Sequence, residues 1–226
     1  PALADNGMPK ERYQLYHLEK AKGGIAMTMV GGSSCVSPDS PSVFGQLNVS
    51  TDQVIPWFRN FSDLIHKENC KMICQISHLG RRTTWNDGHW LPIIAPSRVR
   101  EPAHRGFPKI MDHYDIKRVI SDYVAAARRC RDAGLDGIEI LQNGHLPGQF
   151  LSPDTNFRLD SYGGEFMNRM RFIRELYEAL RTELKEDIVI GARVEMDSKL
   201  KEGLQPDEAL RALEVIESDG TIDYFN

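Results

Sequence analysis

The sequence predicts an α/β fold built on a parallel β-sheet, and three observations support this. Short apolar runs alternate with amphipathic, helix-like segments along the whole chain. The runs are apolar at consecutive positions, which is typical of parallel strands covered on both faces. The composition shows no break along the 226 residues, of which 41% are hydrophobic and 27% charged, so we expect a single domain over residues 1–226. Such alternation favours β-α-β units and hence a parallel sheet.

The first two units lie in the N-terminal third of the chain. Residues 11–22 have helical spacing and are followed by a glycine pair, which suits a helix end. The apolar run IAMTMV, residues 25–30, predicts a strand that stops at Gly31 and Gly32. Residues 52–69 predict the next helix, and KMICQIS, residues 71–77, predicts the second strand.

The middle of the chain contains a long polar excursion over residues 78–111, which includes Trp85 and Trp90. A segment of this length is more than a simple connection, so it indicates an insertion or a functional loop. The pattern resumes with a helix over residues 111–134 that Asp112 or Asp115 would cap. The run GIEIL, residues 137–141, predicts the third strand.

The C-terminal part begins with a second long loop, residues 142–164, rich in Pro, Asn, Asp and Gly. We predict that its N-x-R-x-D-x-Y-G-G portion is a rigid scaffold tied by an Arg158–Asp160 pair and docked on the following helix. The remaining elements come in alternation. They are a helix over 165–185, a strand over 188–194, a helix over 206–218 and a strand over 222–226.

A barrel is favoured over an open, doubly wound sheet. No GxGxxG or GxxxxGK[ST] motif follows any predicted strand, whereas polar residues stand after several different strands, at His78, His145 and Glu195. Sites formed by the ends of many strands are typical of the eight-stranded barrel. Such a barrel needs roughly 250 residues, so five strands indicate an incomplete one. The chain begins at Pro1 and stops at Asn226 within an apolar run, and we expect a fragment truncated at both ends.

Charge and composition exclude several classes of partner. The formal charge of −4 comes without a basic excess, so neither nucleic acid nor a membrane surface is expected as partner. No apolar run approaches the ~18 residues of a membrane span, and the start of the chain shows no leader pattern, so a cytoplasmic location is expected. Small polar metabolites remain the expected substrates. The four cysteines, which form no CxxC pair, are expected to be buried thiols. These are Cys35, Cys70, Cys74 and Cys130.

Two polar residues interrupt otherwise apolar strands. Gln75 lies within the second strand and Arg193 within the fourth, and a buried arginine requires an anionic or strongly accepting partner. A structural salt bridge to Glu195 or Glu139 is one interpretation. The other is a ligand with an electron-rich heterocycle or a carboxylate, which Gln75 and Arg193 would bind. The glycines after the first strand would let a flat ligand lie against the backbone.

His145 is the candidate catalytic residue. It follows the third strand, and an imidazole at the mouth of a barrel suits substrate binding or proton transfer, although a solvated loop histidine is the plainer interpretation. A zinc site is not expected, because no second histidine stands at a ligand spacing.

Three stretches together resemble one family. These are QFLSPDTNFRLDSYGGEFMNRMRF, CQISHLGRR with WLPIIAPS behind it, and AAARRCRDAGLDGIEI. They resemble the old yellow enzyme-like NADH:flavin oxidoreductases along nearly the whole chain. The resemblance implies a TIM (β/α)8 barrel, of which the second to sixth strands are visible, with non-covalent FMN at its mouth. The phosphate-binding loops and the cysteine-rich segment that ligates a 4Fe-4S cluster in larger relatives would lie outside the chain.

The resemblance also assigns site residues. Gln75 and Arg193 match ligands of the flavin ring, Gly32 matches the small residue beside the flavin, and His145 most nearly matches the substrate-binding histidine. The ene-reducing members carry a second His or Asn and a proton-donating tyrosine, whereas Leu146, Pro147 and Gly148 follow here. The GHLPGQFL form is nearer the trimethylamine dehydrogenase and dimethylglycine or betaine demethylase branch.

The expected function is therefore an FMN-dependent oxidoreductase that transfers a hydride between flavin and a small substrate. Oxidative N-demethylation of a methylated amine or amino acid is favoured over NAD(P)H-dependent ene or dienoyl reduction, because the tyrosine is missing. A metal-dependent barrel aldolase or hydrolase using His145 and Glu139 is a further alternative, and a non-catalytic barrel remnant is another. A 4Fe-4S cluster, NAD(P)H, a homo-oligomer and an electron-transfer partner stay open for the full-length protein.

Overall fold

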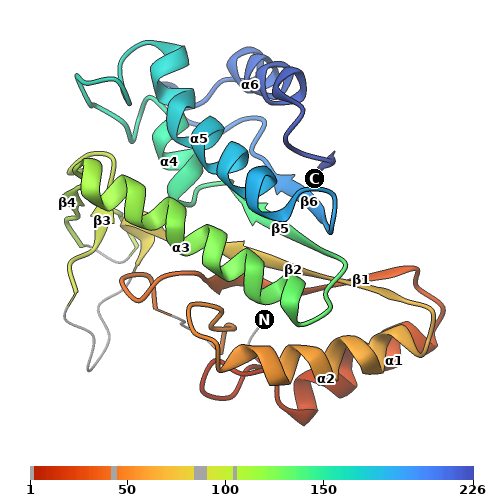
Figure 1. The fold of residues 1–226 in the computed structure, drawn as a ribbon. Helices are drawn as coiled ribbons and strands as arrows, with labels where there is room; N and C mark the ends of the chain where they lie inside the picture. Colours follow the sequence, from red (N-terminus) through yellow and green to blue (C-terminus); the bar gives the residue numbers. More distant parts are fainter. Residues whose placement is uncertain (1–2, 42–44, 84–90, 104–105) are drawn as a thin grey trace.

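A five-stranded parallel sheet forms the centre of the molecule (Figure 1). The computed structural model describes residues 3–41, 45–83, 91–103 and 106–226. The strands follow one another across the sheet in chain order. They are β1 (Met27–Cys35), β2 (Lys71–Ser77), β5 (Gly137–Leu141), β6 (Val189–Arg193) and β7 (Tyr224–Phe225), and each pairs in parallel with the next. The predicted parallel sheet is confirmed.

The helices connect these strands as β-α-β units. They are α1 (Glu11–Lys22), α2 (Val54–His66), α3 (His113–Asp132), α4 (Leu146–Leu151), α5 (Phe166–Leu184) and α6 (Pro206–Asp219), with a short 3-10 helix η1 (Gly80–Arg82). None of the helices in the described ranges is long and apolar enough to cross a membrane.

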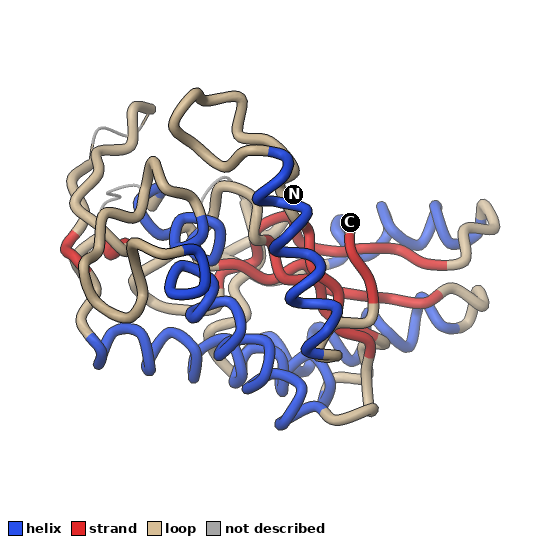
Figure 2. The backbone as a smooth tube through the Cα atoms, turned by 90° about the horizontal axis from the view of Figure 1, so that it is seen from above, coloured by secondary structure: helices blue, strands red, loops and turns tan. Residues whose placement is uncertain are grey.

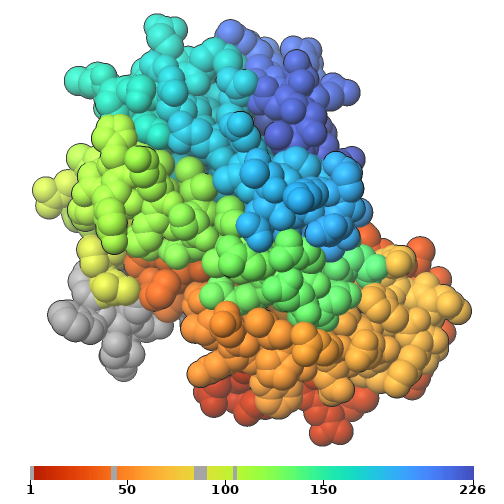
Figure 3. Space-filling model, viewed as in Figure 1, coloured from red at the N-terminus to blue at the C-terminus, as the bar shows by residue number. Residues whose placement is uncertain are grey.

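The strand order has no reversal, so the sheet has no topological switch point of the kind that a doubly wound fold contains. Helices α3 and α5 run along one face of the sheet (Figures 1 and 2). In the space-filling view, the chain advances from its N-terminal units at one end of the molecule to its C-terminal units at the other (Figure 3). This one-directional winding is the arrangement of a barrel wall.

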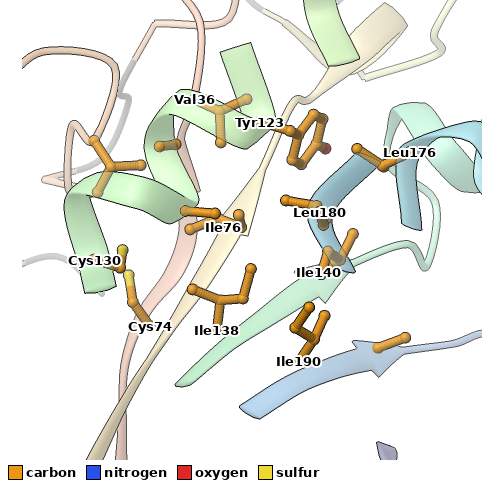
Figure 4. Close-up of a cluster of buried hydrophobic side chains, with 14 of the residues drawn as sticks. Val36, Cys74, Ile76, Tyr123, Cys130, Ile138, Ile140, Leu176, Leu180 and Ile190 are labelled. Carbon is orange, nitrogen blue, oxygen red and sulfur yellow. The ribbon is translucent and has the colours of Figure 1, made fainter. Parts of the chain in front are cut away.

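The main hydrophobic core lies between the sheet and the helices. Alternate strand residues point into it, among them Ile76 of β2, Ile138 and Ile140 of β5 and Ile190 of β6 (Figure 4). These side chains pack against α3 and α5, and Tyr123 of α3 is fully buried among them. Because strand side chains alternate, Gln75, Glu139 and Gly191 face the opposite side of the sheet, where a barrel has its interior.

Two local predictions need correction. The first strand does not stop at Gly31 and Gly32 but continues to Cys35 through a register shift between Val30 and Ser34, because positive-φ residues form a bulge there instead of an end. The loop over 142–164 contains the helix α4, which Pro147 and Gly148 conceal in the sequence.

The excursion over 78–111 contains η1 and a small parallel sheet of β3 (Ile94–Ala95) and β4 (Lys109–Ile110). Its tryptophans, Trp85 and Trp90, lie outside the described residues.

Other local predictions are confirmed. Asp112 and Asp115 both cap α3, in a reciprocal capping box. The Arg158 guanidinium donates to Asp160 at 2.9 and 2.5 Å, and the Asn156 amide donates to the carbonyls of Phe150 and Tyr162, which makes the loop before α5 a rigid scaffold. The four cysteines are buried free thiols.

Candidate active site at the carboxyl edge of the sheet

The carboxyl ends of the parallel strands gather polar residues at one edge of the sheet. Ser77 ends β2, Arg193 ends β6, and His145 follows β5 as the residue before α4. The backbone N–H of Gln142 donates to the Arg193 carbonyl at 3.0 Å, which holds the loop after β5 against the end of β6. The candidate residues on β2, β5 and β6 therefore lie at one edge, as expected for a barrel mouth.

His145 is buried, and its Nδ1 forms a short hydrogen bond with the hydroxyl of Ser77. Its Nε2 has no hydrogen-bond partner among the residues that the structure describes. Burial lowers the pKa of His145 to about 3, and the positive charges of Arg82 and Arg193 and the neighbouring His78 act in the same direction. The imidazole is therefore neutral at neutral pH and offers Nε2 as a hydrogen-bonding group.

A second, fully buried histidine fixes the loop below His145. The Nδ1 of His78 accepts from the N–H of Gly80 at 3.0 Å, so its Nε2 carries the proton and donates to Asp39 at 3.0 Å. Burial opposes ionisation of Asp39, but its bonds to His78, Ser37 and Arg118 lower its pKa well below the usual value. The His78 carbonyl in turn accepts from the N–H that follows His145, at 2.9 Å. This network positions the start of α4.

Gln75 lies inside a buried polar layer on the interior face of the sheet. Its Nε2 donates to Glu139 at 2.7 Å, and its Oε1 accepts from the N–H of Ser33 at 3.2 Å. Glu139 also accepts from the Tyr224 hydroxyl at 3.1 Å and from the Asn226 amide at 3.0 Å. The second N–H of Gln75 donates to the Met29 sulfur at 3.9 Å, so Gln75 is fixed by protein contacts and one lone pair of its oxygen remains for a ligand.

The bulge in β1 brings backbone to the same edge. Gly31, Gly32 and Ser33 all have positive φ, at 101°, 90° and 69°. A Cβ on Gly31 would lie 2.8 Å from the Gln75 carbonyl, so only glycine fits. The Tyr13 hydroxyl of α1 accepts from the Gly31 N–H at 2.8 Å and holds the bulge in place. Gly32 exposes its backbone beside Gln75 with a conformation that disfavours any side chain.

Arg193 is placed differently from the expectation. A buried guanidinium was expected from the sequence, but the Arg193 side chain is exposed. Within β6 it shares a face with Gly191, opposite the core residues Ile190 and Ala192, so it points to the interior side of the sheet. Neither Glu195 nor Glu139 pairs with it, and the guanidinium has no ion-pair partner in the described part of the chain. All its donors are available.

The site also contains residues that were not predicted from the sequence. Ser77, Asp39 and Arg82 had no signal that set them apart from ordinary loop and strand residues. Glu139 was expected either to pair with Arg193 or to bind a metal with His145, but it bonds to Gln75, Tyr224 and Asn226 while His145 bonds to Ser77. In the described ranges, no group of His, Cys, Asp or Glu side chains could hold a metal ion.

The winding of the sheet and the polar residues at its carboxyl edge define part of a (β/α) barrel with a ligand site at its mouth. The chain belongs to the NADH:flavin oxidoreductase / NADH oxidase family, whose model matches residues 2–223. The family expected from the sequence is confirmed.

Curated relatives agree with this assignment. The chain is 49% identical over 99% of its length to the "Multifunctional alkene reductase/demethylase OYE" of Caballeronia cordobensis. It is 45% identical over 100% of its length to the "Probable N-methylproline demethylase" of Rhizobium meliloti (strain 1021). It covers 33% of each of these relatives, so the chain spans about a third of their length. The expected likeness to the demethylase branch is confirmed.

Among solved structures, a 2-naphthoyl-CoA reductase complex matches with a TM-score of 0.90 and 26% identity, covering 99% of this chain and 36% of the other. A morphinone reductase matches with a TM-score of 0.87 at 21% identity, which bears on the fold alone. These neighbours establish the five-stranded sheet as part of a TIM barrel.

The donor set at the mouth fits an isoalloxazine ring, whose pyrimidine edge carries both carbonyl oxygens and a ring N–H. Arg193 offers unpaired donors, the Gln75 oxygen retains one acceptor position, and Gly32 leaves room beside them. The residues present therefore match the ring portion of FMN.

Proposed function

We propose that the protein containing this chain is an FMN-dependent oxidoreductase that removes a hydride from the N-methyl group of a methylated amine or amino acid. Residues 1–226 would form part of its single FMN-binding barrel domain. The observation that carries the proposal is the unpaired guanidinium of Arg193 at the same edge as Gln75 and His145. The demethylase names of relatives that are 45% to 49% identical support the choice of substrate.

In this proposal FMN, when bound, supplies the hydride acceptor. Arg193 places a fixed positive charge where negative charge develops during hydride transfer. Gln75, held by Glu139 and Ser33, orients one edge of the ring by hydrogen bonds. Gly32 allows close approach of the backbone.

His145 orients the substrate in this proposal and does not protonate it, because its lowered pKa keeps it neutral. Its bond to Ser77 fixes the ring so that Nε2 points away from the strand end. The amine nitrogen first loses its ammonium proton to solvent. Loss of hydride from the N-methyl carbon then leaves a substrate iminium, which water converts to formaldehyde and the demethylated amine. The full-length protein would need an acceptor for the two electrons, either NAD(P)+ or an electron-transfer partner, and a 4Fe-4S cluster would serve the latter.

A second function is reduction of an activated alkene by NAD(P)H on the same site. The name of the Caballeronia cordobensis relative, which joins both activities, favours keeping it. The metal-dependent alternative has no such support, since His145 and Glu139 bond to different partners.

The test uses the full-length protein. We expect yellow protein with bound FMN that releases formaldehyde from N-methylproline, and Arg193→Ala should lower FMN affinity and kcat by about 100-fold or more, as for loss of one transition-state donor. Arg128→Ala, an exposed arginine paired with Glu183 on the helical side, is the control. Colourless protein that gains no flavin absorbance with added FMN would contradict the flavin proposal. Fast alkene reduction without formaldehyde release would support the second function instead.

A further inference from the structure

A small cavity lies beside His145, between η1, the start of α4 and the loop that follows β6. Its volume is about 220 Å³. Drug-sized ligands occupy pockets of roughly 300–1,000 Å³, so this cavity suits a small metabolite. Gly144, directly before His145, forms part of its wall, and a Cβ there would lie 3.3 Å from Nη1 of Arg82. The cavity therefore adjoins the start of α4 through Gly144, while His145 itself is not among the residues that line it.

Two opposite charges face this cavity without pairing. Arg82 comes from η1 after β2, and Glu195 comes from the loop after β6. The charge of Arg82 acts on Glu195, yet the two side chains form no ion pair. Neither side chain has a hydrogen-bond partner in the part of the chain that the structure describes. Unpaired charges of both signs across a small cavity indicate a ligand that carries both signs itself.

Arg81, Glu101 and Asp154 are the other charged residues that line the cavity. The charges of Asp154 and Glu101 act on Arg81, its backbone N–H is held by Gln149 at 3.0 Å, and its buried Nε has no hydrogen-bond partner among the described residues. Asp154 accepts from the Ser152 hydroxyl at 2.5 Å. Arg82 is the more exposed of the two arginines, so it is the cation that a ligand carboxylate entering from solvent reaches.

We propose that this cavity binds the zwitterionic part of an N-methylated amino acid, with its carboxylate on Arg82 and its ammonium group on Glu195. The inference rests on the proposed demethylation and narrows its substrate to amino acids. A simple amine would leave the Arg82 guanidinium without a partner. An amino acid satisfies both charges, and a planar guanidinium binds a carboxylate through two parallel N–H bonds. Arg82 and Glu195 thus determine substrate specificity.

The test compares two ligands that differ only in the carboxylate, N-methylproline and N-methylpyrrolidine. For formaldehyde release by the full-length protein, kcat/KM should be at least about 100-fold higher with N-methylproline than with N-methylpyrrolidine. N-methylpyrrolidine has no carboxylate and cannot form the charge-assisted bidentate bond to Arg82. Arg82→Gln should lower kcat/KM for N-methylproline about 100-fold through KM, with a loss at least ten times smaller for N-methylpyrrolidine. Arg82→Lys should fall between Arg82→Gln and the unaltered protein, because it keeps the charge and loses the planar geometry.

Glu195→Gln should weaken both ligands, because both carry the ammonium group. Lys67→Gln, at the exposed end of α2, is the control for loss of one positive charge and should change neither value. Equal losses for the two ligands in Arg82→Gln would overturn the proposal.

A binding measurement distinguishes failure of this inference from failure of the proposed function. Calorimetric titration of the full-length protein with proline and with pyrrolidine needs no turnover. Tighter binding of proline that disappears in Arg82→Gln supports the zwitterion site even in a protein that releases no formaldehyde. Equal binding of proline and pyrrolidine, or binding of proline that is unchanged in Arg82→Gln, overturns it.

Discussion

Burial holds the imidazoles of His145 and His17 in the neutral state. Burial lowers the pKa of His145 to about 3 and that of His17 to about 4. His17 lies on α1, and its Nδ1 bonds to the Thr28 hydroxyl of β1 at 2.6 Å. In both cases a neighbouring hydroxyl satisfies one ring nitrogen while burial disfavours the charged form.

The lowered pKa values of His145 and His17 predict that the free energy of unfolding decreases in acid over a defined pH range. The unfolded chain binds protons at histidine near pH 6.5, whereas the folded chain binds them only near pH 4 at His17 and near pH 3 at His145. As the pH falls from 6.5 towards 4, the unfolded state therefore holds more protons, and the free energy of unfolding decreases. The expected slope reaches roughly 1.4 kcal/mol per pH unit for each histidine. Urea unfolding of the full-length protein at several pH values measures it.

Substitution of one histidine measures its share of this pH dependence of the free energy of unfolding. His17→Gln should remove about one proton from the difference between folded and unfolded states, and so flatten the curve between pH 6 and pH 4.5. His113→Gln, at the exposed start of α3, is the matched control and should leave the slope as it is. An unchanged slope in His17→Gln would show that His17 does not contribute.

At the scale of the elements, the bulge of β1 is the feature on which the candidate flavin site most depends. Gly31→Ala combines backbone strain at φ 101° with a Cβ that would lie 2.4 Å from the Ser34 hydroxyl and 2.8 Å from the Gln75 carbonyl. We expect a loss of about 2–4 kcal/mol in the free energy of unfolding, together with weaker FMN binding. Denaturant unfolding and flavin titration of the full-length protein measure the two effects.

Gly24→Ala separates strain from clash. Gly24 has φ 88°, but a Cβ there would meet nothing within 4 Å. Its cost should therefore be about 1–2 kcal/mol, from strain alone, without an effect on FMN binding. If both variants lose equal stability and bind FMN equally, the close contact of Gly31 with β2 has no special importance.

Periodicity predicted the long elements because each covers several turns or strand residues of one pattern, as in α3 and α5. It missed the six-residue α4, which is stabilised by tertiary bonds such as Leu146 N–H to the His78 carbonyl. The candidate residues Gln75 and His145 stood out because polar groups at strand ends share one edge in a parallel sheet.

Their partners could not be predicted. Ser77 and Glu139 bond to residues 68 and 64 positions away, and no local pattern encodes such pairs. The exposure of Arg193 was also hidden, because the interior face of β6 carries the small Gly191 beside it, where the Tyr224 ring packs.

At the scale of the whole molecule, the sheet has two faces with different chemistry. The helix face is apolar, with Cys74, Ile138 and Ile190 in one continuous core (Figure 4). The interior face carries a hydrogen-bonded layer in which Glu139 of β5 joins β2 to the end of the chain. A barrel positions ligands from several strands only if those strands hold a fixed register, and this layer ties three of them together at one level.

Glu139→Gln tests how far this layer stabilises the molecule. Glu139 accepts from Gln75 at 2.7 Å, Tyr224 at 3.1 Å and Asn226 at 3.0 Å. The glutamine that replaces Glu139 has a single acceptor oxygen, so at least one buried donor would face an N–H group. We expect the free energy of unfolding of the full-length protein, measured with urea, to fall by roughly 1–3 kcal/mol.

Glu175→Gln is the matched control. Among the described residues, Glu175 accepts one bond, from the Tyr162 hydroxyl at 2.8 Å, and this bond can still go to the amide oxygen. The loss at Glu139 should therefore exceed that at Glu175, and FMN affinity should fall only in Glu139→Gln, since Gln75 would lose its fixed orientation. Equal losses of stability with unchanged FMN affinity would mean that the register of the barrel depends on the apolar core alone.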